Sequence, residues 1–110
     1  MGISAIGTVV LINFPFADLK TYKKRPAVVA ASGSLGTVIL CQITSRHIPG
    51  VPGIKLTPKD FSEGGLPPVS YVRPDKLFTV DASVLKNSLG KLHPLATRKI
   101  RREVTKLFIG

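Results

Sequence analysis

The sequence predicts a small, mainly β domain: a β-barrel capped by one C-terminal α-helix. Short runs of apolar and β-branched residues recur along the chain, separated by stretches rich in Gly and Pro. Non-helical connections between so many short strands favour a barrel over a layered α/β domain. A helical period of apolar residues begins only after Pro94. A chain of 110 residues can bury one core, so we expect a single domain over residues 1–110.

The first three strands are expected in the first half of the chain. Residues 7–14 are mostly apolar or β-branched and are followed by a proline, which is typical of a strand that stops abruptly. A polar, basic loop is expected over residues 17–25. Apolar strands then follow at residues 27–31 and 38–43, and the glycine-containing interval at 33–36 is short enough for a hairpin.

The middle of the chain is expected to be dominated by loops. Residues 47–68 are interrupted repeatedly by Gly and Pro, with one brief strand at residues 54–57. Ser70–Arg73 and Lys76–Val80 have the composition of two halves of a further strand, bent where Pro74 removes an amide donor. Five or six strands are therefore expected in all.

An amphipathic helix is expected after Pro94, which is a favourable first helical residue. Its apolar positions fall on one helical face: Leu95, Ile100, Val104, Leu107 and Phe108. Its basic positions point elsewhere: Arg98, Lys99, Arg101, Arg102 and Lys106. This pattern predicts a helix that caps the barrel with its apolar face and presents positive charge to solvent.

The charge balance indicates an anionic partner. The chain has 16 Lys and Arg against 6 Asp and Glu, a formal net charge of +10. Its 44% hydrophobic residues are too many for a disordered basic tail, so this charge is expected on a folded surface. Nucleic acid is the commonest partner of such a domain.

The cysteine and histidine content and the short apolar runs exclude several classes of protein. Cys41 is the single cysteine, which excludes an internal disulfide and a cysteine-based zinc site. His47 and His93 lie far apart in sequence, so no metal or other cofactor is expected. The apolar runs are much shorter than the roughly 18 residues of a membrane span, and no secretory signal is evident. We therefore expect a cytoplasmic protein that does not bind a membrane.

Several sequence blocks, in order, resemble the MazF/PemK toxins of type II toxin-antitoxin systems. The blocks span residues 7–16, 24–29, 41–45, 65–67 and 70–77, and the similarity continues through 89–92 to the final helix. The resemblance implies an SH3-like β-barrel, usually a homodimer, that cleaves single-stranded mRNA without a metal. It also implies an acidic cognate antitoxin that silences the toxin.

Metal-free RNA cleavage needs a base for the attacking 2′-hydroxyl, an acid for the leaving oxygen, and positive charge for the phosphorus oxygens. Arg25 has a guanidinium suited to gripping a phosphate, although by residue type alone a solvated arginine beside two lysines is the simpler interpretation. The resemblance places Arg25 in the catalytic centre.

Arg73 and Asp75 are two residues apart, so a regular strand would project both side chains from one face. Without the resemblance, a surface ion pair is the simpler interpretation. With it, Asp75 is the expected base. We expect Arg73 to stabilise charge, because a guanidinium with a free pKa above about 12 is a poor proton donor.

Hydroxyl groups and further basic residues complete the expected site. Thr44 and Ser45 end the third strand, where their hydroxyls are common strand-end chemistry and, by the resemblance, part of the catalytic centre. Phe16 is expected to stack on RNA, or else to pack at the barrel rim, and three lysines are expected to contact phosphates: Lys20, Lys23 and Lys24. Some family members have an acidic residue where this chain has Lys20, which favours Asp75 as the base.

The leading hypothesis is thus an endoribonuclease toxin. The alternative is a non-catalytic SH3-like barrel that binds RNA or an acidic protein, since small barrels support many functions. A weaker third possibility places the basic C-terminal helix on DNA, although no helix-turn-helix precedes it.

Overall fold

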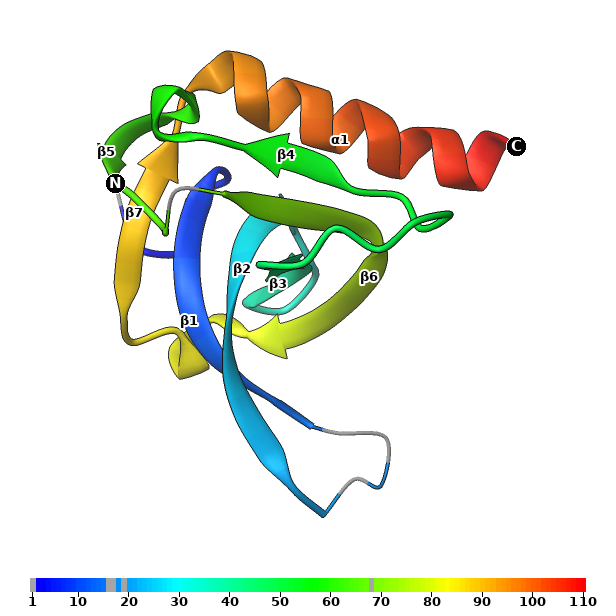
Figure 1. Cartoon of the computed structure of the whole chain (residues 1–110). Helices are drawn as coiled ribbons and strands as arrows, with labels where there is room; N and C mark the ends of the chain where they lie inside the picture. The colour runs from blue at the N-terminus through cyan, green and yellow to red at the C-terminus, as the bar shows by residue number, and fades with distance from the viewer. Residues whose placement is uncertain (1, 16–17, 19, 68) are drawn as a thin grey trace.

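The computed structural model describes residues 2–15, 18, 20–67 and 69–110. Within this part of the chain one seven-stranded antiparallel sheet, in the order β4-β6-β3-β2-β1-β7-β5, curls into a barrel-like shape (Figure 1). The strands are β1 Thr8–Pro15, β2 Tyr22–Ser32, β3 Thr37–Thr44, β4 Ile54–Leu56, β5 Phe61–Gly64, β6 Ser70–Asp81 and β7 Ser88–Leu92. Two short 3-10 helices, η1 Pro58–Asp60 and η2 Ala82–Val84, and one α-helix, α1 Pro94–Ile109, complete the fold. The predicted mainly β barrel with a C-terminal helix is confirmed.

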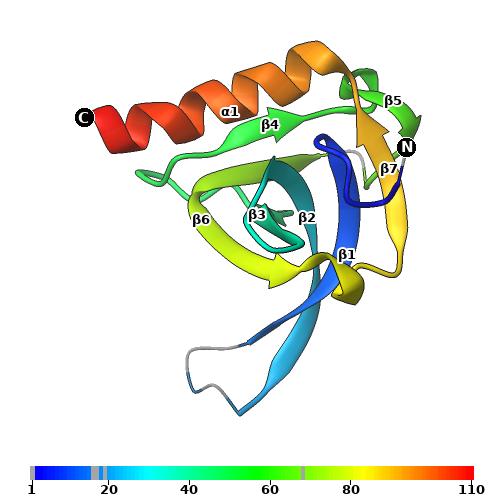
Figure 2. The ribbon, with the colours of Figure 1, turned by 180° about the vertical axis from the view of Figure 1, so that it is seen from behind.

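The second strand is longer than predicted. β2 begins at Tyr22, so Lys23, Lys24 and Arg25 lie in a strand and not in the expected basic loop. The reason is pairing with β1, in register from Pro15↔Tyr22 to Val9↔Val28, which overrides the weak strand propensity of lysine. These residues form a two-stranded ribbon that projects from the barrel, clearly visible from both sides (Figures 1 and 2).

The bend predicted near Pro74 is present, but it does not divide the strand into two. β6 runs continuously over Ser70–Asp81. Against β3, Cys41 pairs with Leu77 and Ile43 with Val72, so β6 advances five residues while β3 advances two. The three extra residues form a bulge around Pro74, which re-aims the side chains beside it.

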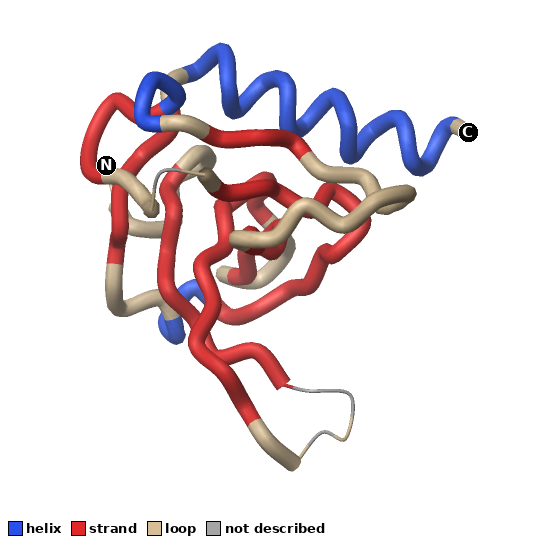
Figure 3. The backbone as a smooth tube through the Cα atoms, in the orientation of Figure 1, coloured by secondary structure: helices blue, strands red, loops and turns tan. Residues whose placement is uncertain are grey.

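Two strands were missed, β7 and the edge strand β5, and they bring the number of strands above the expected five or six. β5 and β7 pair with each other, and the partners include Gly64↔Gly90. A Cβ atom at Gly90 would lie 2.5 Å from the backbone oxygen of Glu63, so the close approach of these strands requires glycine. A glycine inside a short polar stretch resembles a turn in sequence, which is why the strand signal was hidden (Figure 3).

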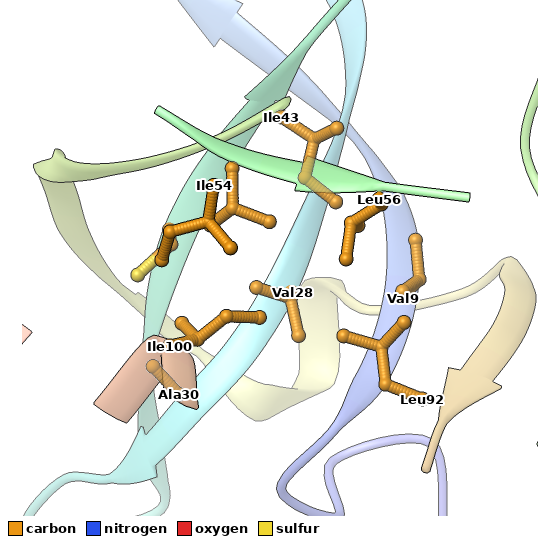
Figure 4. Packing of buried hydrophobic residues seen from close by; sticks show 10 residues of the cluster. Val9, Val28, Ala30, Ile43, Ile54, Leu56, Leu92 and Ile100 are labelled. Carbon is orange, nitrogen blue, oxygen red and sulfur yellow. The ribbon is translucent and has the colours of Figure 1, made fainter. Parts of the chain in front are cut away.

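Two hydrophobic clusters fill the two faces of the curled sheet, because strand side chains alternate. One contains Val9, Val28, Cys41 and Ile43, together with Ile100 from α1 (Figure 4). The other cluster is built on alternate residues of the same strands: Val10, Ala27, Val29, Val38, Leu40 and Leu85. Cys41 is completely buried, as expected, and burial raises the pKa of its thiol to about 12.

The helix docks through a narrower contact than its pattern predicts. Ile100 is buried and Val104 packs against the core, but Leu95 and Phe108 are 75% and 76% exposed, and Leu107 is exposed as well. The prediction that all five apolar residues face the barrel is therefore wrong. The C-terminal end of the helix extends beyond the sheet (Figure 1), and the residues of α1 that pack against the core are Ala96, Ile100 and Val104.

Candidate active site

A basic cleft of about 470 Å³ opens where β2, β3 and β6 meet. β3 pairs with β2 only from Ala27↔Gln42 onward, so the edge of β2 over residues 22–25 is not paired with β3 and leaves room for the cleft. The cleft is lined by Lys23, Arg25, Gln42, Thr44, Ser45, Arg46, Ile48, Arg73 and Lys76. The cleft lining includes four of the five residues predicted to be catalytic: Arg25, Thr44, Ser45 and Arg73. The fifth, Asp75, forms an ion pair with Arg73.

Arg73 and Asp75 form a two-pronged ion pair beside the β6 bulge. Arg73 Nε donates to Asp75 Oδ1 at 3.0 Å, and Nη2 donates to Oδ2 at 2.8 Å. The expected shared face of these two side chains is confirmed. The pair uses two of the five N–H donors of the guanidinium, which leaves three for another acceptor.

The ion pair shifts both pKa values toward the charged forms. Hydrogen bonding to Arg73 lowers the pKa of Asp75 below its ordinary value of 3.8, against a smaller opposing effect of burial. The same bonds raise the pKa of Arg73 further. At neutral pH the site therefore holds a carboxylate and a guanidinium, and Arg73 cannot readily give up a proton.

The basic residues of β2 divide between two places. Lys23 and Arg25 line the basic cleft, whereas Lys24 lines a different groove. Alternate side chains of a strand point to opposite faces, and Lys24 stands between the other two. That Lys23 and Lys24 both contact RNA stays a prediction, but the two side chains lie in different grooves because they belong to a strand and not to the expected loop.

Lys20, another predicted RNA contact, is not part of the cleft lining. Lys20 is in the turn between β1 and β2, where its backbone N–H donates to Asp18 Oδ1 at 2.9 Å. Phe16 lies outside the described residues.

The end of β3 supplies hydroxyl groups and an arginine. Thr44 is the last residue of the strand and Ser45 follows it. The Thr44 Oγ1 accepts a hydrogen bond from the backbone N–H of Arg46 at 3.2 Å, which fixes the turn that carries Arg46 into the cleft.

Sequence reasoning missed Gln42, Arg46 and Lys76 as members of the site. Gln42 had an available signal, since it precedes Thr44 by two residues on a strand and must share its face. Arg46 follows the strand and Lys76 lies in the bulge. In neither place does the regular alternation of strand side chains predict which way a residue points. Only the tertiary structure places these two in the cleft.

The cleft has a strong positive field. Five of its lining residues are cationic, and the adjacent carboxylate of Asp75 is already held by Arg73. Elsewhere in the described part of the chain, the other ion pair is Lys106 with Glu103 on α1. Unpaired cations around a concave surface favour a polyanion, and guanidinium groups favour phosphates.

Neither a cluster of metal-ligating side chains nor a membrane-spanning helix is found among the described residues. No three His, Cys, Asp or Glu side chains gather closely enough there to hold a metal ion. No helix among those residues has the length and apolar character needed to cross a membrane.

Comparison with known families gives one match over nearly the whole chain. The sequence profile described as "PemK-like, MazF-like toxin of type II toxin-antitoxin system" matches residues 5–108. A comparison with curated protein sequences found no match.

Several solved structures have a similar fold. MazF from Deinococcus radiodurans is 23% identical, with a TM-score of 0.70 over 96% of each chain. A MazE-MazF complex from the same organism is 26% identical, with a TM-score of 0.64 over 93% of this chain and 92% of the other. An endoribonuclease in complex with its cognate antitoxin, from a mycobacterial species, is 17% identical, with a TM-score of 0.63 over 94% and 92%.

Proposed function

Because the chain belongs to the PemK-like, MazF-like toxins of type II toxin-antitoxin systems, we propose that its own activity is the cleavage of single-stranded mRNA. The observation that carries this proposal is the basic cleft, in which an arginine-carboxylate pair adjoins a second arginine and two hydroxyls. These groups match what phosphodiester cleavage by an internal nucleophile requires.

The reaction begins with the phosphodiester bound between Arg25 and Arg73. Both guanidinium groups have N–H donors for the non-bridging oxygens, and Thr44 and Ser45 add hydroxyls at the same place. Their role is to stabilise the negative charge that grows on the phosphorus oxygens in the transition state.

Asp75 then acts as the base. Its carboxylate takes the proton of the RNA 2′-hydroxyl while that oxygen attacks the adjacent phosphorus. The new bond joins the 2′-oxygen to phosphorus, and the bond from phosphorus to the 5′-oxygen breaks, with water supplying the proton to the leaving oxygen. No metal takes part in this scheme, and Arg73 contributes charge, not a proton.

The same cleft explains the proposed partners. A surface that binds polyanionic RNA through five cations also accepts a carboxylate-rich peptide, so an acidic antitoxin would inhibit by direct competition. A homodimer, as implied by the family, and a cytoplasmic location, as required for action on mRNA, belong to the same proposal.

The test is cleavage of a long mRNA by the purified protein in EDTA, with the product ends mapped. We expect cuts at a short recurring motif and 2′,3′-cyclic phosphate ends. Arg25→Ala, Arg73→Ala and Asp75→Asn should each abolish cleavage and keep the circular dichroism spectrum of the folded protein. Arg98→Ala, which removes an exposed arginine on α1, is the matched control and should retain activity.

A salt-sensitive shift of RNA on a native gel, without any product on a denaturing gel, would instead establish a binding barrel with no catalytic activity. Full activity in Asp75→Asn would show that another group is the base.

A further inference from the structure

A second groove lies beside the β1–β2 ribbon, on the other side of the ribbon from the basic cleft. Its volume is about 470 Å³, and we call it the ribbon groove. It is lined by residues from β1, β2, the end of β6, η2 and the segment before β7, among them Leu11, Asn13, Lys24, Val84, Lys86 and Asn87. The Leu11 N–H donates to the Asn87 backbone oxygen at 3.1 Å and so ties these two walls together.

The ribbon separates the two sites. β7 pairs with β1 only as far as Val10↔Ser88, so the outer edge of β1 beyond this point has no paired strand. The opposite edge of the ribbon, on β2, is the one that borders the basic cleft. Lys23 and Arg25 serve one site and Lys24 the other, so neighbouring residues supply positive charge to both.

The ribbon groove has the charge of an anion site. Its lining includes two lysines and no carboxylate, and neither lysine takes part in an ion pair among the described residues. The nearest carboxylate in sequence, Asp81, is engaged elsewhere, because it accepts the Ser83 N–H at 2.9 Å. Lys24 and Lys86 are both exposed and their charges are available to a ligand.

The other lining groups fit a nucleotide better than a bare anion. Asn13 and Asn87 have amides that can both donate to and accept from the edge of a base. Leu11 and Val84 provide apolar surface for the face of a base, and Val84 is 47% exposed. Tyr22 is 63% exposed on the same ribbon, where a second base can stack.

We propose that the ribbon groove binds a segment of single-stranded RNA outside the segment that the basic cleft cleaves. The proposal rests on the proposed function in taking RNA as the ligand, but it does not depend on catalysis. RNA is the assigned ligand because it has a partner for each kind of group in the groove: phosphates for the lysines, base edges for the amides and base faces for the apolar wall.

The test measures binding of a fluorescent 2′-O-methyl RNA of about 16 nucleotides, the upper range of site size on a small barrel. This oligonucleotide lacks the free 2′-hydroxyl and cannot be cleaved. Lys24→Ala/Lys86→Ala should weaken binding at least about tenfold, as expected for the loss of two charge-assisted contacts. It should also reduce the slope of log affinity against log salt by about 1.4.

Two further variants make the assignment specific. Asn13→Ala/Asn87→Ala should weaken binding without changing the salt slope, because no charge is removed. Lys59→Ala/Lys99→Ala removes two exposed lysines from outside both sites and should change the affinity far less. Combining the groove variant with Arg73→Ala should multiply the two losses, since separate sites act additively in free energy.

Equal losses in the Lys24/Lys86 and Lys59/Lys99 variants would overturn the proposal. Two other results for the Lys24→Ala/Lys86→Ala variant would also overturn it, because they would assign the groove to a protein partner. One is loss of binding to an acidic peptide while RNA binding is intact, and the other is a changed oligomeric state in sedimentation. Groove-dependent RNA binding by a protein that cleaves nothing would refute the proposed function alone. Normal cleavage with groove-independent binding would refute this inference alone.

Discussion

At the scale of single residues, the informative feature is the Arg73–Asp75 pair. The sequence left two interpretations, a surface ion pair and a catalytic pair, and the geometry is compatible with both. The Arg73 side chain is only 15% exposed and that of Asp75 is 34% exposed, so the pair is partly shielded, and its arginine lines the cleft. A partly shielded pair contributes little to stability, which favours a role in binding and chemistry.

The first prediction concerns stability against pH. The pKa of Asp75 lies lower in the folded chain than its ordinary 3.8, so the unfolded chain binds more protons in this range. The stabilisation from the pair is therefore complete above that ordinary value and is lost as the pH falls through the lower folded-state pKa. In urea unfolding at neutral pH, the free energy of unfolding of the wild type should exceed that of Asp75→Asn by less than about 1 kcal/mol.

That difference should shrink as the pH falls below the ordinary pKa of 3.8 and disappear once the carboxyl is protonated in both states. Glu63→Gln is the control, because Glu63 makes no ion pair among the described residues. A difference in the free energy of unfolding between wild type and Asp75→Asn that is the same at every pH would contradict the assigned ion pair.

The second prediction concerns the cleft residues that the sequence did not reveal. Arg46→Ala and Lys76→Ala should each raise KM for RNA about tenfold and affect kcat less, because each removes a charge-assisted phosphate contact. Steady-state kinetics on a short RNA substrate would measure both constants. Lys55→Ala, an exposed lysine of β4 outside the cleft, should leave them unchanged. A loss confined to kcat would instead place these side chains at the transition state.

At the scale of elements, irregularities in the strands create the site. β2 continues past its pairing with β3, and β6 carries three extra residues opposite β3. The first irregularity leaves room for the cleft, and the second carries Arg73 and Lys76 in its lining, with Asp75 paired to Arg73. A regular barrel with the same residues would have neither feature, so the strand pairing itself determines the chemistry.

The third prediction concerns the docking of α1. Ile100→Ala should destabilise the protein by about 2–5 kcal/mol, since Ile100 is only 1% exposed and its truncation leaves a cavity. Leu95→Ala, on the same helix at 75% exposure, should change stability by less than about 0.5 kcal/mol. Urea unfolding of both variants tests this, and equal costs would mean that the helix docks through its whole apolar face.

At the scale of the whole molecule, the net charge of +10 is unevenly distributed. Five of the 16 Lys and Arg line the basic cleft and two line the ribbon groove. Residues 86–106 hold seven basic residues against one Glu, mostly on the exposed side of α1. The cleft and groove provide localised contacts, whereas the helix raises the affinity for any polyanion.

The fourth prediction follows from this distribution. For a short RNA that fills only the cleft, five phosphate contacts give a slope of about −3.5 for log affinity against log salt, so a fourfold rise in salt weakens binding about a hundredfold. Fluorescence anisotropy at several salt concentrations would measure the slope. Arg46→Ala/Lys76→Ala should reduce the steepness by about 1.4, and Arg98→Ala/Lys99→Ala on the helix should barely change it. A slope governed by the helix residues would reject the cleft as the binding site.

The sequence by itself determined the fold class and the position of the helix, which follow from apolar runs and proline positions. The candidate site residues came from the resemblance to the MazF/PemK toxins, because residue type and spacing alone favoured solvated side chains and a surface ion pair. Only the tertiary structure decided that Lys24 leaves the cleft and that Arg46 and Lys76 join it, because both outcomes depend on strand pairing and on a bulge. Pairing partners lie far apart in sequence, and one residue of register moves a side chain to the opposite face.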